Sequence, residues 1–221
     1  MAILPATLTP RRLTAVKVGV FTLCLVPVVW VVYALFTGGL GANPVEAMIR
    51  HLGDWGLRLL LVTLAITPLR LATGGAWLIR LRRMLGLFAF FYVALHFSAY
   101  VVFEQSGSIV RIAEDIAKRP YILVGAMALV ALIPLAVTST QAWMRRLGKR
   151  WKQLHRLVYP AAVLAVFHFF MLIKADAWTE PLLYAGILTA LLAYRAQHTA
   201  RGRWRRPARS AQKPGWRSAS T

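Results

Sequence analysis

Cysteine and acidic residues are scarce in this sequence of 221 residues, which contains one Cys and seven Asp or Glu. The single cysteine, Cys24, excludes an internal disulfide, a Cys-x-x-Cys redox pair, a four-cysteine metal cluster and a covalently attached c-type haem. Charged residues make up only 15% of the chain, whereas soluble globular domains contain about 25%. Hydrophobic residues make up 58%, too large a share for a disordered chain. This composition argues against a soluble enzyme.

Nucleotide-binding motifs are also missing, since the chain has neither a G-x-G-x-x-G fingerprint nor a P-loop. The longest segments between apolar runs, 37–54 and 104–120, are too short to build a nucleotide-binding domain. Hydride chemistry with a nicotinamide cofactor would therefore have to occur on another protein.

Six apolar runs stand out, each of roughly the 18–20 residues that an α-helix needs to cross about 30 Å of hydrocarbon. They cover residues 16–36, 55–72, 85–103, 121–138, 157–173 and 181–196. The run 55–72 is the weakest, because Arg58 and Arg70 lie close to its ends. The runs predict an all-α membrane protein, a bundle of six transmembrane helices.

The basic residues predict how this bundle is oriented. Six crossings place 21 of the 27 Lys and Arg on the side of the N-terminus, and all seven acidic residues on the other side. By the positive-inside rule, both termini are then cytoplasmic. We expect a basic arm at 1–15, a transmembrane domain at 16–196 and a disordered basic tail at 197–221.

A net charge of +20 would suggest nucleic-acid binding in a soluble protein. Here the excess falls on the predicted cytoplasmic side, where basic residues are attracted to anionic lipid headgroups. The charge therefore predicts membrane lipids, and no nucleic acid, as the partner of the basic segments.

Histidines within the apolar runs are the candidates for chemistry, because ionisable residues inside a bilayer are costly. His96 lies 13 residues after Arg83, and His168 lies 12 residues after Arg156. These spacings correspond to about 20 Å and 18 Å along two helices that start from the same side. Two imidazoles at one depth are what the iron of a b-type haem needs for axial ligation.

Two other functions use the same residues differently. His96 and His168 could form the proton relay of a small transporter, or only hydrogen-bond between helices in a haem-free scaffold subunit. His155 would point about 140° away from His168 on an ideal helix. Pro160 lies between them and permits altered winding, which would bring both rings onto one face.

Three further side chains are expected near a cofactor. Tyr100 is one helical turn beyond His96, and Tyr159 is one turn beyond His155, so each is placed to contact a cofactor edge. Arg83 lies at the cytoplasmic boundary, where a guanidinium pairs readily with haem propionates or a flavin phosphate.

Four stretches resemble the MsrQ family, which belongs to the wider ferric-reductase-like transmembrane group. GLFAFFYVALHFSAY at 86–100 and KRWKQLHRLVYPAAVLAVFHFF at 149–170 look like its haem-bearing helices. Residues 42–70, ending in ITPLR, and 115–140, with KRPYILVG and a closing TST, also fit. The resemblance covers about residues 10–196.

This resemblance implies a b-type haem subunit in the bacterial inner membrane. Such a subunit passes electrons from the quinone pool or a flavin reductase to a periplasmic molybdopterin-containing methionine sulfoxide reductase. The family is also described as binding FMN, but no motif here marks an FMN site. The implied haem ligands fall on His96, His155 and His168. Helix 85–103 offers only His96 where the wider group has two histidines, which leaves one haem or two open.

Overall fold

The computed structural model describes residues 4–172 and 178–204, and within these ranges the secondary structure is helical throughout. The expected all-α class is confirmed. In chain order the elements are α1 (Pro10–Thr37), α2 (Pro44–Thr73), the short turn η1 (Ala76–Arg80), α3 (Arg82–Ala99), the π-turn η2 (Tyr100–Glu104), α4 (Ile109–Lys118), α5 (Pro120–Val137), α6 (Gln141–Leu147), α7 (Lys149–Leu154), the 3₁₀ turn η3 (His155–Leu157), α8 (Val158–Leu172) and α9 (Thr179–Trp204).

Five stretches of the described chain are long and apolar enough to cross a membrane. They are Pro10–Thr37, Pro44–Thr73, Arg82–Glu104, Pro120–Val137 and Lys149–Leu172. The chain is thus a multi-pass membrane protein, and five of the six expected runs coincide with these spans to within one residue at the end of each run. The sixth run, 181–196, is helical within α9 but is not one of the five, since its apolar part is shorter and ends at Arg195.

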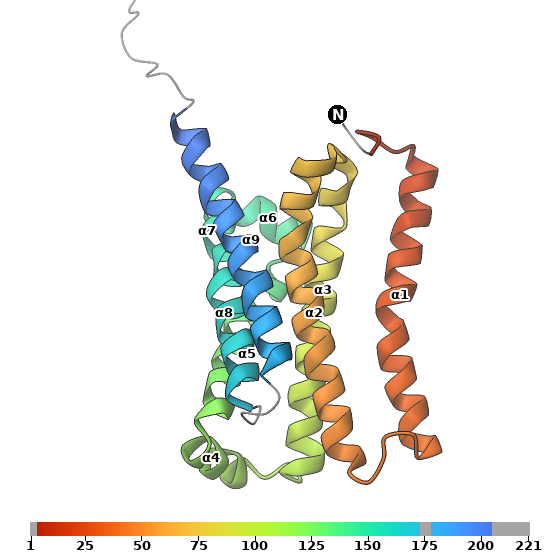
Figure 1. Ribbon diagram of the computed structural model, residues 1–221, viewed down its shortest axis with the longest axis vertical. Helices are drawn as coiled ribbons and strands as arrows, with labels where there is room; N and C mark the ends of the chain where they lie inside the picture. The colour runs from red at the N-terminus through yellow and green to blue at the C-terminus, as the bar shows by residue number, and fades with distance from the viewer. Residues whose placement is uncertain (1–3, 173–177, 205–221) are drawn as a thin grey trace, which may run out of the picture.

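The helices form a bundle in which α2 packs mainly on α3, and α5 mainly on α8. Figure 1 shows α1 at one edge of the bundle, and the start of α1 and the end of α9 at the same end of the molecule. The short helix α4 lies at the opposite end. The outward side of α1 exposes large apolar residues such as Leu23 and Phe36, as expected of a helix that faces lipid.

Helix α1 contains a proline, and near it a side chain of α3 forms hydrogen bonds with the α1 backbone. Pro27 lies inside α1 and disturbs the hydrogen bonds of the turn around it. The buried hydroxyl of Tyr92, on α3, donates to the Cys24 carbonyl at 2.7 Å and accepts the Val28 N–H at 3.0 Å. Tyr92 therefore fixes α1 against α3 through backbone atoms.

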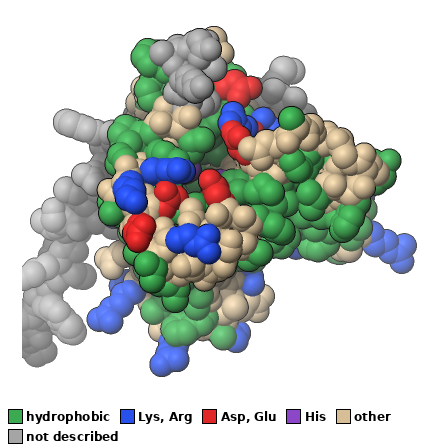
Figure 2. All heavy atoms as spheres, turned by 90° about the horizontal axis from the view of Figure 1, so that it is seen from below, with side chains coloured by type: hydrophobic (Ala, Val, Ile, Leu, Met, Phe, Trp, Pro, Cys, Tyr) green, Lys and Arg blue, Asp and Glu red, His purple; other side chains and the backbone are tan. Residues whose placement is uncertain are grey.

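The end of the bundle that carries α4 holds the ion pairs of the described residues. They are Arg50–Glu46, Lys118–Glu114, Arg119–Glu104 and Arg119–Asp115. Figure 2 looks at this end, where acidic and basic side chains lie side by side and are surrounded by apolar surface. The segregation of acidic residues to one end agrees with the charge asymmetry of the sequence.

Candidate functional site

A cavity of about 400 Å³ lies between α2, α3, α5 and α8. Apolar side chains, including Leu57, Leu60 and Leu129, form much of its wall, and His96 and His168 both line it. Polar residues also border the cavity, among them Glu46, Arg50, Asp54, Glu104 and Arg119. A mostly apolar chamber with two converging imidazoles has the character of a cofactor site.

The side chain of His96 is held by α2. Its Nδ1 lies 2.8 Å from the carbonyl oxygen of Ile49. A carbonyl oxygen can only accept, so Nδ1 carries the proton and Nε2 keeps its lone pair. The ring also packs on Gly53, where an added β-carbon would come within 3.0 Å of Nδ1. Helix α2 therefore sets both the tautomer and the position of His96.

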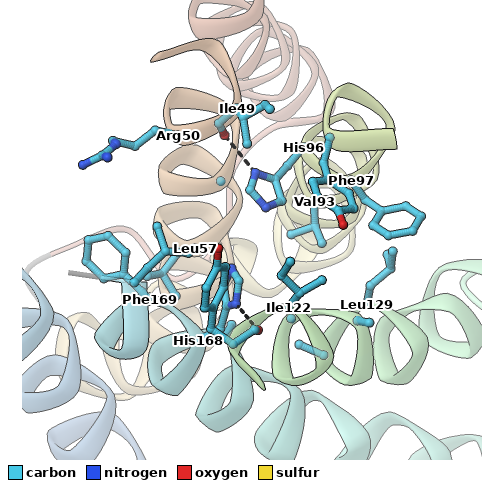
Figure 3. Close-up of a pocket in the computed structure, with 18 of the residues that line it drawn as sticks. Ile49, Arg50, Leu57, Val93, His96, Phe97, Ile122, Leu129, His168 and Phe169 are labelled. Atoms are coloured by element: carbon cyan, nitrogen blue, oxygen red, sulfur yellow. Dashed lines mark hydrogen bonds between the residues drawn. The ribbon is translucent and has the colours of Figure 1, made fainter. Parts of the chain in front are cut away.

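The side chain of His168 is held by α5 in the same way. Its Nδ1 lies 2.7 Å from the carbonyl oxygen of Tyr121, which again leaves Nε2 as the ring nitrogen with a lone pair. An added β-carbon on Gly125 would lie 2.9 Å from the ring. Figure 3 shows the two histidines on facing sides of the cavity, each with its backbone hydrogen bond.

The distance between the two rings matches that of two ligands on one metal. Their centroids are 6.2 Å apart and their planes are inclined by 77°. A metal–imidazole bond of about 2.0–2.1 Å on each side, with about 1.1 Å from ring nitrogen to centroid, gives about 6.3 Å between centroids. Within the described residues, no group of three or more His, Cys, Asp and Glu is placed to hold a metal ion. The residues thus fit axial ligation of a haem iron rather than a protein-only metal cage.

The two histidine sites are copies of each other at a fixed offset of 72 residues. Each Nδ1 bonds to a carbonyl 47 positions earlier in the chain. In each case the glycine under the ring lies four residues after that carbonyl. Ala89 and Ala161, both fully buried on the two histidine-bearing helices, follow the same offset. The pairs α2–α3 and α5–α8 therefore present the two imidazoles from matching helix pairs.

Comparison with known proteins identifies this architecture. The model of the family described as ferric reductase like transmembrane component matches residues 52–166. A Rhodospirillum rubrum protein named protein-methionine-sulfoxide reductase heme-binding subunit MsrQ is 54% identical over 188 residues, which cover 85% of this chain and 90% of the relative. The chain belongs to the MsrQ family.

Other relatives of the same name support this membership. The protein of Xanthomonas oryzae pv. oryzae strain MAFF 311018 is 52% identical over 182 residues, with 82% of this chain and 83% of the relative covered. That of Azospira oryzae is 46% identical over 205 residues, with 91% and 87% covered. The resemblance to MsrQ proteins in the sequence is thus confirmed.

His155, the third histidine expected from the sequence to bind haem, lies away from the cavity. It begins the turn η3, so the altered winding expected near Pro160 is present in this helix. Its Nε2 is 3.2 Å from the Thr138 hydroxyl, and its ring stacks on Trp151 with centroids 3.9 Å apart. His155 and His168 therefore both face α5, at its opposite ends, and only His168 lines the cavity.

Of the other three residues expected near a cofactor, one lines the cavity and two do not. Tyr100 lines the cavity, and its hydroxyl donates to the Asp115 carboxylate at 2.9 Å. Tyr159 lies elsewhere and accepts a hydrogen bond from Arg195 at 2.8 Å. Arg83 is exposed and does not line the cavity.

The two glycines and the two carbonyls that position the rings were not predicted from the sequence. Gly53 and Gly125 have no functional side chain that would mark them as part of a site. The Ile49 and Tyr121 carbonyls are backbone groups, which every residue has. The signal that points to them is the shared offset of 72 residues, which becomes visible only when the two histidines are aligned with each other.

Proposed function

We propose that this chain is the haem-binding membrane subunit of a protein-methionine-sulfoxide reductase system and that it carries electrons across the bacterial inner membrane. The names of its relatives, at about half identity over most of the chain, support this role. The observation that carries the proposal is the facing pair His96 and His168, with ring centroids at 6.2 Å and each Nδ1 bonded to a carbonyl.

His96 and His168 are the proposed axial ligands of one haem b. Both Nε2 atoms have the lone pair that ligation requires, since each Nδ1–H donates to a backbone carbonyl. When bound, a haem supplies one-electron chemistry through its iron. Leu57, Leu60 and Leu129 form an apolar part of the cavity wall, against which a haem macrocycle would pack. Tyr100, which lines the same cavity, is proposed to contact the cofactor edge.

The remaining proposed residues lie near the end of the bundle where α1 begins and α9 ends, which six crossings place on the cytoplasmic side. His155 is the candidate ligand of a second haem, for which its Nε2 would have to leave Thr138. Arg83 and Tyr159 lie near this end and are proposed to surround a cofactor there. FMN is a further cofactor that the family resemblance supports, and we assign it no residues on that basis.

We also propose that α9 is the sixth crossing. It runs alongside the bundle in Figure 1 and brings the described end of the chain to the level where α1 begins. Six crossings put both termini in the cytoplasm, where most basic residues are then located. The segments 1–15, 16–196 and 197–221 are the corresponding arm, transmembrane domain and tail.

The proposed path of electrons follows from this orientation. The donor is the quinone pool or a flavin reductase at the cytoplasmic side, and the acceptor is a periplasmic molybdopterin-containing subunit that reduces protein methionine sulfoxide. The histidine cavity is bordered by the ion-paired residues Arg50 and Arg119, at the end of the bundle that six crossings place in the periplasm. That position favours transfer to an external partner.

The absorption spectrum of the purified full-length protein tests this proposal. A reduced-minus-oxidised spectrum of a low-spin b-type haem is expected, at one haem or more per chain. A protein that contains no haem and instead moves protons when reconstituted in vesicles would be the His96–His168 proton relay, and the proposal would be wrong.

A further inference from the structure

Helix α4 is amphipathic, although it lies outside the five membrane spans. Its sequence IVRIAEDIAK places the apolar residues on one side of the helix and the charged residues on the other. A helix of 10 residues is marginal in water unless it packs on another surface. All residues of α4 are described by the structure, and none of them is buried. The described chain therefore leaves the apolar side of α4 largely uncovered.

The charged side of α4 is turned towards the bundle. Asp115 accepts hydrogen bonds from the Tyr100 hydroxyl and the Gln105 amide, both at 2.9 Å. On an ideal helix, Ile109 and Val110 point about 120–140° away from Asp115. Their exposed fractions are 82% and 68%. The apolar side of α4 thus faces outwards, the reverse of a surface helix in a water-soluble protein.

The short connections of α4 hold it close to the membrane boundary. Only the four residues 105–108 join the span Arg82–Glu104 to α4, and only Arg119 joins α4 to the span Pro120–Val137. Four residues reach at most about 14 Å when fully extended. Helix α4 also packs on α5 and lies across the direction of the long helices (Figure 1). It is therefore placed at the depth of the lipid headgroups.

The neighbouring ends of the two spans also expose apolar side chains. Val102 and Phe103 lie in the last turn before Glu104, and Leu123 lies in the first turn of α5. All three are exposed, as expected of helix surfaces that face lipid. Along the chain, exposed apolar residues therefore continue from the spans onto α4. Figure 2 shows apolar surface around the charged side chains at this end.

From this arrangement we infer that α4 is an interfacial helix, with its outward apolar side inserted among the phospholipids of the leaflet at this end of the bundle. Amphipathic helices bind membranes in this way, at about 5–10 Å into the boundary between headgroups and acyl chains. Ile109 and Val110 supply the largest inserted side chains, and Ala113 and Ala117 lie between them and the second turn of the same side. The inference holds for either leaflet and does not depend on the proposed haem.

The inserted helix is connected to the wall of the histidine cavity. Asp115 bonds to Tyr100 and pairs with Arg119 at 3.0 Å, and both of these residues line the cavity. Arg119 lies two residues before Tyr121, whose carbonyl accepts the hydrogen bond of His168. The polar side of α4 thus joins the lipid-bound helix to both helix pairs that carry the imidazoles.

Fluorescence quenching on the full-length protein in phospholipid vesicles tests the inference. Cys24→Ala removes the native thiol, so that Ile109→Cys provides a single site for a fluorescent maleimide. Lys118→Cys, which is exposed on the charged side of the same helix, is the matched control. Brominated acyl chains should quench the label at 109 roughly threefold more than the label at 118, and aqueous iodide should quench the label at 118 more strongly.

Val110→Cys gives a second labelling site on the apolar side if Ile109→Cys does not fold. Equal quenching of the labels on the two sides by brominated lipid would overturn the inference. So would a label at 109 that iodide quenches until the separate catalytic subunit is added, because the apolar side of α4 would then be a docking surface for a protein rather than for lipid.

Discussion

A β-carbon on Gly125 would lie 2.9 Å from the imidazole of His168, a separation that real β-carbons essentially never show. Gly53 stands in the same relation to His96, at 3.0 Å. The absence of a side chain at these two positions lets each ring lie against the neighbouring helix. The rings then face each other across the cavity with centroids 6.2 Å apart.

The first prediction concerns these glycines. Gly125→Ala should displace the His168 ring by a few tenths of an ångström or more and lower haem content, with a shift from low-spin to high-spin absorption. Gly53→Ala should act in the same direction but more weakly, because its contact is slightly longer. Haem content and the Soret spectrum measure both effects.

Gly19→Ala is the matched control. An added β-carbon there meets nothing within 4 Å, and replacing glycine by alanine inside a helix stabilises it by roughly 0.5–1 kcal/mol. Normal haem content is therefore expected for Gly19→Ala. Normal spectra for Gly125→Ala would show that the close approach is not needed for ligation.

The second prediction concerns the ligands. His96→Ala and His168→Ala each leave one axial imidazole, so low-spin haem should be lost from the cavity or become high-spin. His155→Ala should leave the spectrum of this haem intact, because His155 bonds to Thr138 outside the cavity. A low-spin spectrum that survives His96→Ala but disappears in His155→Ala would reverse the assignment.

The equal depth of His96 and His168 could be predicted from sequence because the rise of an α-helix is fixed, so counting residues from the basic boundary gives distance along the axis. Which way a ring points depends on how closely helices approach. Carbonyl partners 47 residues away therefore could not be predicted from helical periodicity. The direction of His155 depends on the local winding at η3, and Pro160 indicated only that some change of winding was allowed.

The membrane spans could be predicted from the sequence, but the contacts between them could not. Composition alone locates the first five apolar runs, since a lipid-facing helix must be apolar along its length. Packing determines two other contacts, which join segments far apart in the sequence. The Tyr92 hydroxyl donates to the Cys24 carbonyl, and Arg195 donates to the Leu64 carbonyl. Pro68 indicates that the Leu64 carbonyl needs another donor, and Pro27 indicates that the hydrogen bonds of α1 are disturbed nearby, but neither proline identifies the side chain that supplies the new contact.

The third prediction concerns the hydroxyl of Tyr92. Tyr92→Phe removes the group that bonds to Cys24 and Val28 of α1 in a buried setting. We expect a loss of about 1–2 kcal/mol in the free energy of unfolding. Denaturation in detergent measures it, with Tyr33→Phe, on the exposed side of α1, as a neutral control. Equal stability of the two variants would mean that the Tyr92 hydroxyl does not stabilise the backbone of α1.

The fourth prediction concerns orientation. Reporter fusions after residues 45 and 110 should report the periplasm, and a fusion after residue 145 should report the cytoplasm. The reason is that most basic residues then lie inside. A fusion after residue 198 decides whether α9 crosses. A periplasmic signal there would leave five crossings, and a cytoplasmic signal at 110 would contradict the proposed orientation of the bundle in the membrane.

The last prediction is that the chain conducts electrons but does not reduce sulfoxides itself. Its single thiol, Cys24, is buried inside α1, away from both ends of the bundle. At the end that carries α4, the polar side chains pair with one another: Asp115 bonds to Tyr100, Gln105 and Arg119, and Glu46 bonds to Arg50. We therefore expect sulfoxide reduction to require the separate catalytic subunit.

Stopped-flow spectroscopy separates the two steps. The purified chain should be reduced by a quinol or a reduced flavin and should show no turnover of methionine sulfoxide alone. Adding the oxidised molybdopterin-containing subunit should reoxidise the haem and begin turnover. His96→Ala should abolish that turnover, because without its ligand pair the haem of the cavity no longer lies between donor and partner. Haem that stays reduced after the partner is added would show that electrons leave by another route, and turnover by the isolated chain would place the catalytic centre within this bundle.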